Sequence, residues 1–461
     1  MRASSSAASG GEEEGANWVF LGESTSGTCV EAFTLQGSRS TTRRALEMRI
    51  GLLTACLAMA IFMPALAQDY DSLFEALDDT VRARFYDPHF GGRDWNAISA
   101  QHRVRLPEVR DDVEFRRLGQ GMLDALGVSH VSLHPPGSGG PTLGLAVRTE
   151  DVNGQTVVVE IDPASAARVA GLRIGDRILD TEAIRGPREL PAQLDVERCD
   201  GSQARLSVPR ESAFWPPRER TISWSVLRRG DGRSVGYLKA DRFGDDAAAL
   251  IDAAMSTLGK TDGLLIDVRG NSGGNASALR LLGYFGTPGP GVALLSRPFL
   301  ETLAGPVRAE DLADIHRVEG AYTTEAIFAA VGAGNGAVML MVEDLGAQRY
   351  SGPVAILIGP ETGSAAEGFA WGAREQSDAV LVGRNTYGAL LSSERLPLPD
   401  GWAVTLPVHG TWGPDGRDYG DKPVPPHVAT AHSREAICRQ DDVDLSAAIG
   451  VLENAWRTEV R

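Results

Sequence analysis

The sequence predicts an α/β protein whose largest domain contains a mostly parallel sheet covered by helices. The prediction rests on the region after Ser234, where short apolar runs alternate with helical patterns. The stretches "GLLIDVRG", "PVAILIG" and "AVLVG" are typical of buried strands, and "NASALRLLGYF" and "SAAEGFAWGAREQ" follow two of them with helical spacing. Because parallel strands need a crossover between them, this alternation indicates βα units with helices on the sheet faces.

Composition is that of an ordinary globular protein and limits the partners to be expected. The chain has 461 residues, enough for two or three domains, and a formal net charge of −16. This acidity argues against binding nucleic acids or anionic membranes, which attract basic surfaces. No Cys/His cluster has the spacing of metal ligands, so we expect no metal and no cofactor. Cys199 and Cys438 are compatible with a disulfide but do not establish one.

The N-terminal segment has the pattern of a secretory signal. Residues 1–47 are rich in Ser, Gly, Glu and Thr, and we expect them to be disordered and to precede the true start at Met48. Residues 48–67 combine one Arg, an apolar stretch and an Ala-Leu-Ala cleavage site. The apolar stretch is too short for a transmembrane anchor, and too few apolar residues precede Cys56 for a lipoprotein signal. We therefore expect an exported protein, periplasmic or secreted, with no stable membrane anchor after cleavage.

The rest of the chain divides into four predicted regions. They are an N-terminal helical region (68–136), a small sheet with one or two helices (141–225), the main α/β domain (226–430) and a C-terminal helical tail (431–461). In the first region Leu73, Leu77 and Val81 have the spacing of one helical face. The Pro/Gly-rich stretch "HPPGSGGP" separates this region from the small sheet.

Ser364 is the first candidate for chemistry, because it stands where an apolar strand turns into a helix. A helix start and the amide of Ala365 would stabilise a negative charge on a neighbouring oxygen. Gly273 and Gly274 precede a helix after another strand, which ends at Asp267, and they can present amides to the same place. The alternative is a simple helix cap, since Ser364 and Glu367 have the spacing of a capping box. The spacing alone leaves both interpretations open.

The chain after the signal resembles the carboxyl-terminal processing (tail-specific) proteases and the core of the tricorn protease. The matching stretches follow the family order: "LDALGVSHVSL", "LGLAVRT", "PASAARVAGLRIGDRIL", "GYLKADRF", "LLIDVRGNSGG", "TGSAAEGFAWGAREQSDAVLVGRNTYG" and "LPDGWAVTLPV". The resemblance implies a crotonase-like (ClpP/crotonase) α/β protease core with an inserted PDZ domain. It also makes Ser364 the nucleophile, with Gly273 or Gly274 and Ala365 as oxyanion donors.

The small sheet is the segment that resembles a PDZ domain. Gly144, Leu145, Ala146 and Val147 match the loop that binds a carboxylate in such domains. PDZ domains take an extended peptide as an added strand and hold its end on main-chain amides. The resemblance therefore implies peptide or protein substrates that are engaged through their C-terminal tails. A monomer and a homo-oligomer are both compatible with the sequence.

The family divides by the base that activates the serine. In one type a lysine follows a T-x-G turn, and "NTYGALL" has Ala389 at that position. In the tricorn type the base is a histidine preceded by a serine, which matches His130 and Ser129. An imidazole titrates near neutral pH and can accept the proton of a hydroxyl. The resemblance thus implies a Ser-His rather than a Ser-Lys enzyme.

A glutamate of the tricorn type is also missing, because Gly420 occupies its position in "DYGDKPVPPHV". Asp418 or Asp421 is the candidate to replace this orienting carboxylate. The sequence then predicts an exported serine endopeptidase in which Ser364 attacks and His130 acts as base. The alternative is a weakened or inactive protease scaffold that only binds peptides. An acyl-CoA enzyme of the crotonase type is disfavoured by the signal and the PDZ-like segment.

Overall fold

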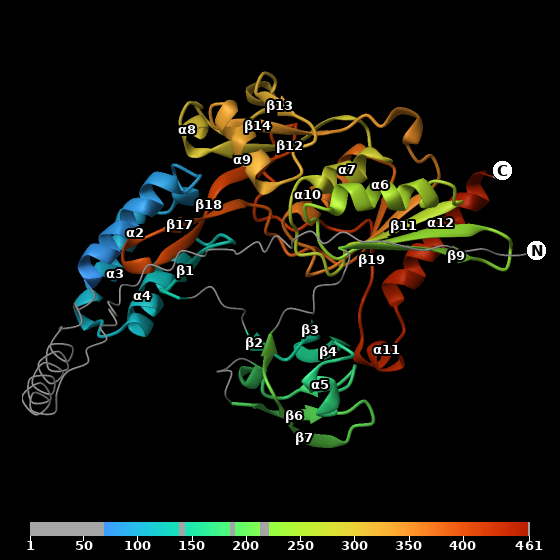
Figure 1. The fold of residues 1–461 in the computed structure, drawn as a ribbon, viewed down its shortest axis with the longest axis horizontal. Coiled ribbons are helices and arrows are strands. Elements are labelled where there is room, and N and C mark those ends of the chain that lie inside the picture. Colours follow the sequence, from blue (N-terminus) through green and yellow to red (C-terminus); the bar gives the residue numbers. More distant parts are fainter. Residues whose placement is uncertain (1–68, 138–142, 185–189, 213–220, 460–461) are drawn as a thin grey trace, which may run out of the picture. The chain divides into compact units, whose positions relative to one another are not determined.

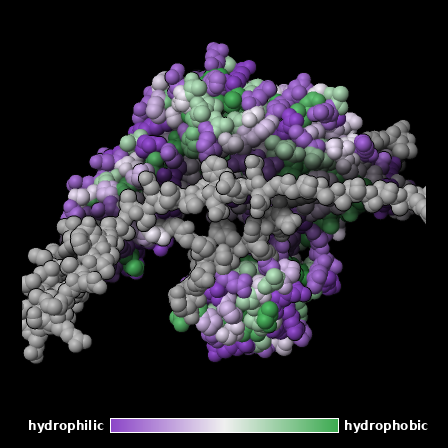
Figure 2. Space-filling model, viewed as in Figure 1, coloured by the Kyte–Doolittle hydropathy of each residue, from purple (hydrophilic) through white to green (hydrophobic). Residues whose placement is uncertain are grey.

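The computed structural model describes residues 69–137, 143–184, 190–212 and 221–459. The predicted upstream segment (1–47) and signal (48–67) lie outside the described residues. No helix in these described ranges is long and apolar enough to cross a membrane. Hydrophilic and hydrophobic side chains are interspersed over the face shown in Figure 2.

Six strands form the main sheet, in the order β19-β16-β15-β11-β10-β9 (Figure 1). They are β9 (Ile222–Arg228), β10 (Ser234–Ala240), β11 (Gly263–Asp267), β15 (Val354–Ile358), β16 (Val380–Gly383) and β19 (Val428–Ala429). All neighbours run parallel except β9, which is antiparallel to β10. Their buried side chains alternate between the two faces, so that Leu264 and Ile266 belong to one core and Leu265 to another.

Helices cover both faces of the main sheet. They are α6 (Ala247–Leu258), α7 (Ser277–Gly283) and α10 (Ala365–Gln376) on the Leu264 side, and α12 (Val443–Glu459) on the Leu265 side. β11, β15 and β16 and the helices α7 and α10 occur where the sequence predicts them. The predicted α/β domain with parallel strands is therefore confirmed.

A second sheet, which the sequence pattern does not reveal, has the order β1-β18-β12-β14-β13 with β17 also paired to β18. Its strands are β1 (Ser132–His134), β12 (Gly289–Ser296), β13 (His316–Val318), β14 (Ala337–Val342), β17 (Ser392–Pro397) and β18 (Ala403–Trp412). The segments between them include α8 (Arg297–Leu300), η4 (Ala309–Leu312), α9 (Thr324–Ala333), η5 (Gly346–Gln348) and η6 (Pro399–Gly401). Many of these pairings join distant parts of the chain, which local periodicity cannot predict.

The N-terminal region is helical and packs on the second sheet (Figure 1, blue). Its elements are α2 (Tyr70–Arg84), η1 (Phe90–Gly92), α3 (Trp95–Arg103), η2 (Leu106–Glu108) and α4 (Asp112–Asp124). Leu73, Leu77 and Val81 are buried on one face of α2, as their spacing predicts. The following strand β1 pairs with β18, with Ser132 opposite Thr405, and this pairing fixes the place of the residues just before it.

The small sheet is antiparallel, with the order β3-β4-β5-β6-β7. Its segment contains β2 (Leu143–Gly144), β3 (Val147–Val152), β4 (Gln155–Ile161), α5 (Ala166–Val169), β5 (Arg177–Ile178), η3 (Glu182–Ile184), β6 (Ala192–Glu197), β7 (Gln203–Val208) and β8 (Glu211–Ser212). The predicted small-sheet region (141–225) includes the start of β9, but this strand pairs with β10 of the main sheet. It does so because Ile222 is buried in the core formed with α6.

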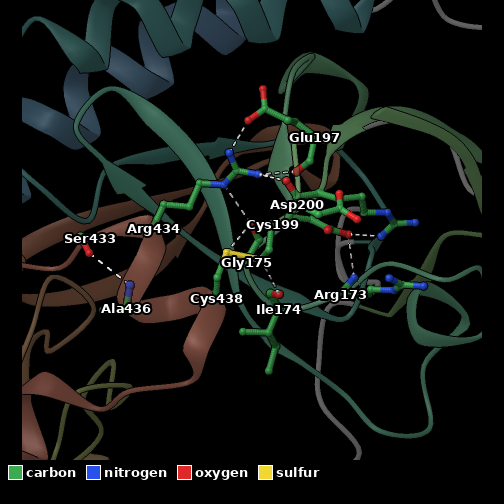
Figure 3. The surroundings of a disulfide bond; sticks show 12 residues. Arg173, Ile174, Gly175, Glu197, Cys199, Asp200, Ser433, Arg434, Ala436 and Cys438 are labelled. Atoms are coloured by element: carbon green, nitrogen blue, oxygen red, sulfur yellow. Dashed lines mark hydrogen bonds and ion pairs between the residues drawn. A yellow bond between two sulfur atoms is a disulfide. The ribbon is translucent and has the colours of Figure 1, made fainter. Parts of the chain in front are cut away.

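The C-terminal segment joins the small sheet to the rest of the protein (Figure 3). Cys438 of α11 (Arg434–Arg439) forms a disulfide with Cys199, next to the end of β6. Arg434 of the same helix donates to the side chain and main chain of Glu197 and to the carbonyl of Gly175. The disulfide that the sequence leaves open is therefore formed, with hydrogen bonds beside it.

Replacing Cys438 by serine is expected to lower the free energy of unfolding by about 2–4 kcal/mol. The disulfide restricts the unfolded chain strongly, because its cysteines are 239 residues apart. Urea unfolding of residues 68–461, with and without a dithiol reductant, measures the effect. Reductant should destabilise the native protein and leave Cys438→Ser unchanged. Equal stability of the oxidised native protein and the variant would contradict the expectation.

Candidate active site

Ser364 lies at the sharp turn between β15 and α10, and its main chain has an unusual conformation. Its φ is 51° and its ψ is −124°, whereas a residue that caps a helix normally has an extended backbone. A positive φ is costly for a residue with a side chain, and such strain is concentrated at functional sites. A Cβ on Gly273 would lie 2.6 Å from the Ser364 Cβ, so only glycine permits this close approach. The main chain therefore forms a sharp elbow at Ser364, and the predicted capping box of Ser364 and Glu367 is formed as well.

A buried carboxylate, Glu367, holds the elbow in place. Its side chain is fully buried and accepts the main-chain amide of Ser364 at 3.1 Å. It also accepts the Thr386 hydroxyl (2.6 Å) and the amides of Gly388 (2.6 Å) and Ala389 (2.7 Å). Burial raises the pKa of Glu367, and these donors act in the opposite direction. Glu367 therefore ties the serine to the loop that carries Ala389, the position of the family's lysine.

His130 precedes β1 and also has a positive φ, 61°. Its Nδ1 lies 2.9 Å from the Ser129 hydroxyl, and the Ser129 amide donates to Asp421 Oδ1 at 3.1 Å. Burial lowers the pKa of His130 below its ordinary value, and the Asp421 carboxylate acts in the opposite direction. The structure therefore brings Ser129, His130 and Asp421 together.

The two candidate orienting carboxylates differ in their surroundings. Asp418 accepts from Lys422 Nζ at 2.8 Å and from the Gly420 amide at 2.9 Å. Asp421 is the one that binds Ser129. The segment that carries both is anchored by Tyr419, whose ring stacks on Trp371 of α10 at 4.9 Å. The structure thus favours Asp421 over Asp418.

Ser364 and His130 line one cavity of about 220 Å³, together with Gly274 and Ala365. Within the described part of the chain, the amides of Gly274 and Ala365 have no hydrogen-bond partner. The Gly273 amide, by contrast, donates to Asn271 Oδ1 at 2.8 Å. Of the two glycines that the sequence offers as oxyanion donors, the structure therefore leaves Gly274 available, and Gly273 serves the packing of the elbow.

The cavity walls beyond these residues are mostly aliphatic. Val292 and Leu294 of β12, Leu340 of β14 and Gly368 of α10 contribute to them. Among the described residues that line it, none is Asp, Glu, Lys or Arg. The cavity is therefore suited to an uncharged group.

The predicted peptide-binding residues lie at the start of the small-sheet segment, and none of them lines this cavity. Gly144 ends β2, Leu145 and Ala146 are buried, and Val147 begins β3. Ala146 has a φ of 51°, and its carbonyl accepts the amide of Asp162 at 3.1 Å. β3 pairs only with β4 in the described part of the small sheet, so it is an edge strand there.

Sequence reasoning missed several residues that shape the site. Glu367 gave only the signal of a capping-box partner, and its bonds to residues 386–389 depend on tertiary packing. Nothing in the sequence around Asn271 or Trp371 indicates a role at the site, because their partners are common residue types or lie far away in the chain. A strained serine that shares a cavity with an imidazole, and with two amides that have no partner among the described residues, has the parts of a serine hydrolase site.

Comparison with known proteins also indicates a serine hydrolase. Residues 234–430 match peptidase family S41, and residues 66–124 match the tricorn protease C1 domain. The chain therefore contains a peptidase family S41 domain over residues 234–430. It is thus related to serine peptidases that include the carboxyl-terminal processing proteases.

The relatives share low identity over long stretches. The chain is 27% identical over 252 residues to a tricorn protease homologue of Streptomyces coelicolor, covering 46% of this chain and 21% of the relative. It is 23% identical over 407 residues to the chloroplastic carboxyl-terminal-processing peptidase 3 of Arabidopsis thaliana, covering 81% and 71%. It is 23% identical over 398 residues to a carboxyl-terminal-processing protease of Picosynechococcus, covering 78% and 84%. The chain thus spans about a fifth of the first relative and most of the other two.

Solved structures show the same fold. A photosystem II D1 C-terminal processing protease superposes with a TM-score of 0.52 at 18% identity, over 81% of this chain and 97% of that one. Mature CPAF superposes with a TM-score of 0.56 at 14% identity, over 84% and 98%. The architecture is therefore the α/β protease fold of family S41.

Replacing Glu367 by alanine is expected to lower the free energy of unfolding by about 3 kcal/mol, because buried donors around it lose their acceptor. Glu361→Gln is the matched control on the other side of Ser364. Glu361 is partly exposed and pairs with Arg148 at 3.0 Å, so its loss should cost under about 1 kcal/mol. Chemical unfolding measures both values. Similar losses for the two variants would contradict the role assigned to Glu367.

Proposed function

We propose that the protein is an exported serine endopeptidase that cleaves peptides or proteins and engages them through their C-terminal tails. The observation that carries the proposal is the cavity lined by strained Ser364, by His130 and by two residues whose amides have no partner in the described part of the chain. The names of the relatives, which include carboxyl-terminal processing proteases, support the substrate class. Export rests on the signal pattern of residues 48–67.

In the proposed mechanism Ser364 attacks the scissile carbonyl while His130 takes its proton. With Nδ1–H donating to the Ser129 hydroxyl, the free Nε2 of the neutral ring is the basic atom. The amides of Gly274 and Ala365 bind the oxyanion that forms. His130 then returns the proton to the leaving amine, and water hydrolyses the acyl-enzyme by the same route. Asp421 stabilises the transient imidazolium through its charge.

The site lacks the family's lysine and glutamate, but it retains groups that can carry out catalysis. At the lysine position the Ala389 amide donates a hydrogen bond to Glu367, so this loop helps to hold the buried carboxylate. Asp421 supplies a carboxylate beside Ser129, although Gly420 replaces the glutamate. These contacts favour an active enzyme over a peptide-binding scaffold.

The proposed tail-binding site is the edge of β3, next to Gly144–Val147. An extended peptide can add to this edge as a further strand. Arg148 of β3 pairs with Glu361, which lies three residues before Ser364. A tail bound along β3 would therefore lie on a strand that contacts the nucleophile's loop.

Cleavage of synthetic peptides with free C-terminal carboxylates and uncharged side chains tests the proposal. The native protein (68–461) should cleave them, whereas Ser364→Ala and His130→Ala should lose about 1,000-fold or more in kcat/KM. Ser223→Ala, an exposed serine of β9, is the matched control and should keep full activity. Cleavage that survives in Ser364→Ala would overturn the assigned nucleophile. Equal cleavage of amidated and free tails would overturn engagement through the carboxylate.

Asp421→Asn is expected to shift the acid limb of the kcat/KM profile to lower pH. His130 must be neutral to act as base, and Asp421 is the group that raises its pKa. Removing that charge lowers the pKa further, so the neutral form persists to lower pH. The plateau rate should fall, because the imidazolium loses its stabilising partner. Asp418→Asn is the matched control, and an equal shift in both variants would contradict the assignment.

A further inference from the structure

Two successive serines, Ser392 and Ser393, line the Ser364 cavity at the start of β17. In a regular strand successive side chains point to opposite faces. Here Ser392 lies opposite His409 and Ser393 opposite Pro407 of β18, so the register shifts between the two serines. Such a bulge redirects a side chain, which explains how both residues border one cavity.

A buried imidazole fixes the Ser392 hydroxyl. His409 is 6% exposed, its ring packs on Phe328 with centroids 5.3 Å apart, and its Nδ1 lies 3.1 Å from Ser392 Oγ. Burial, and to a smaller extent Arg84, lowers the pKa of His409 to about 4, so the ring is neutral at neutral pH. A neutral imidazole keeps one donor and one acceptor nitrogen, and the Ser392 hydroxyl retains capacity for a further partner.

Two other polar side chains at this cavity, those of Thr411 and Asn275, are already engaged. The Thr411 hydroxyl donates to the carbonyl of Leu390. The Asn275 side chain donates to Asp245 and accepts the amide of Ser277. Ser392 is therefore a polar group held in place by His409, in a cavity whose lining also includes Val292 and Leu340.

We propose that Ser392, positioned by His409, is a specificity residue that selects a substrate side chain with a hydroxyl or carboxamide group and an apolar body. This inference rests on the proposed peptidase function and specifies which substrate side chains the cavity prefers. Threonine fits the description, because its methyl faces the aliphatic wall while its hydroxyl pairs with Ser392. Valine has nearly the same shape but would leave the remaining hydrogen-bonding capacity of the Ser392 hydroxyl unused beside a methyl group, which costs affinity.

Peptide binding to the Ser364→Ala protein tests the inference without requiring catalysis. The probes are pairs of short uncharged peptides that differ only by Thr or Val, at each position in turn. At one position we expect the Thr peptide to bind about tenfold more tightly. The preference should vanish in Ser364→Ala/Ser392→Ala. Ser392→Thr, which keeps a hydroxyl, should retain it.

Variants of His409 distinguish a role in positioning the Ser392 hydroxyl from a role in folding. His409→Leu should abolish the Thr preference, whereas His409→Asn should restore much of it by placing a hydrogen-bonding atom near Nδ1. A Thr preference that is absent from the start, or unchanged by Ser392→Ala, overturns the inference. Cleavage by the native protein without any Thr preference overturns only this inference. Thr-selective binding without cleavage overturns only the proposed peptidase activity.

Discussion

The bonds around Glu367 are the constraint on which the rest of the active site depends. A carboxylate that is fully buried is unfavourable unless donors surround it, and Glu367 accepts from Ser364, Thr386, Gly388 and Ala389. These donors come from the elbow and from the loop that leads to β17. Satisfying one carboxylate therefore sets the positions of both segments, and it stabilises a serine whose φ of 51° would be costly on its own.

Helix α10 contributes residues that organise the active site along its whole length. Ser364 stands before its first residue, Glu367 lies in its first turn, and Trp371 and Glu375 lie further along it. Trp371 stacks on Tyr419, and Glu375 accepts the Tyr419 hydroxyl, which anchors the segment leading to Asp421. Asp421 in turn binds Ser129 beside His130. Helix α10 thus positions Ser364 directly. It positions His130 indirectly, because Trp371 and Glu375 anchor Tyr419 and with it the segment that carries Asp421.

The sequence predicted the elements whose signal is local. The apolar strand before Ser364, the helix after it and the paired glycines could be read from spacing, and family resemblance added His130 and Ser129. The second sheet could not be predicted, since many of its pairings, such as Ser132 with Thr405, join residues that are far apart in the chain. The choice between Gly273 and Gly274, and between Asp418 and Asp421, depends on single hydrogen bonds that only the folded chain defines. For the same reason the predicted boundary at residue 225 falls within β9, which pairs with β10 of the main sheet.

The central claim is that Ser364 is an activated nucleophile, and labelling with a serine-directed fluorophosphonate tests it most directly. The reagent is added to folded protein of residues 68–461, and the modified residue is mapped by mass spectrometry. The account predicts a phosphonylated Ser364, with labelling lost in Ser364→Ala and strongly slowed in His130→Ala. Folded protein that stays unlabelled, or is labelled at another serine, would contradict it.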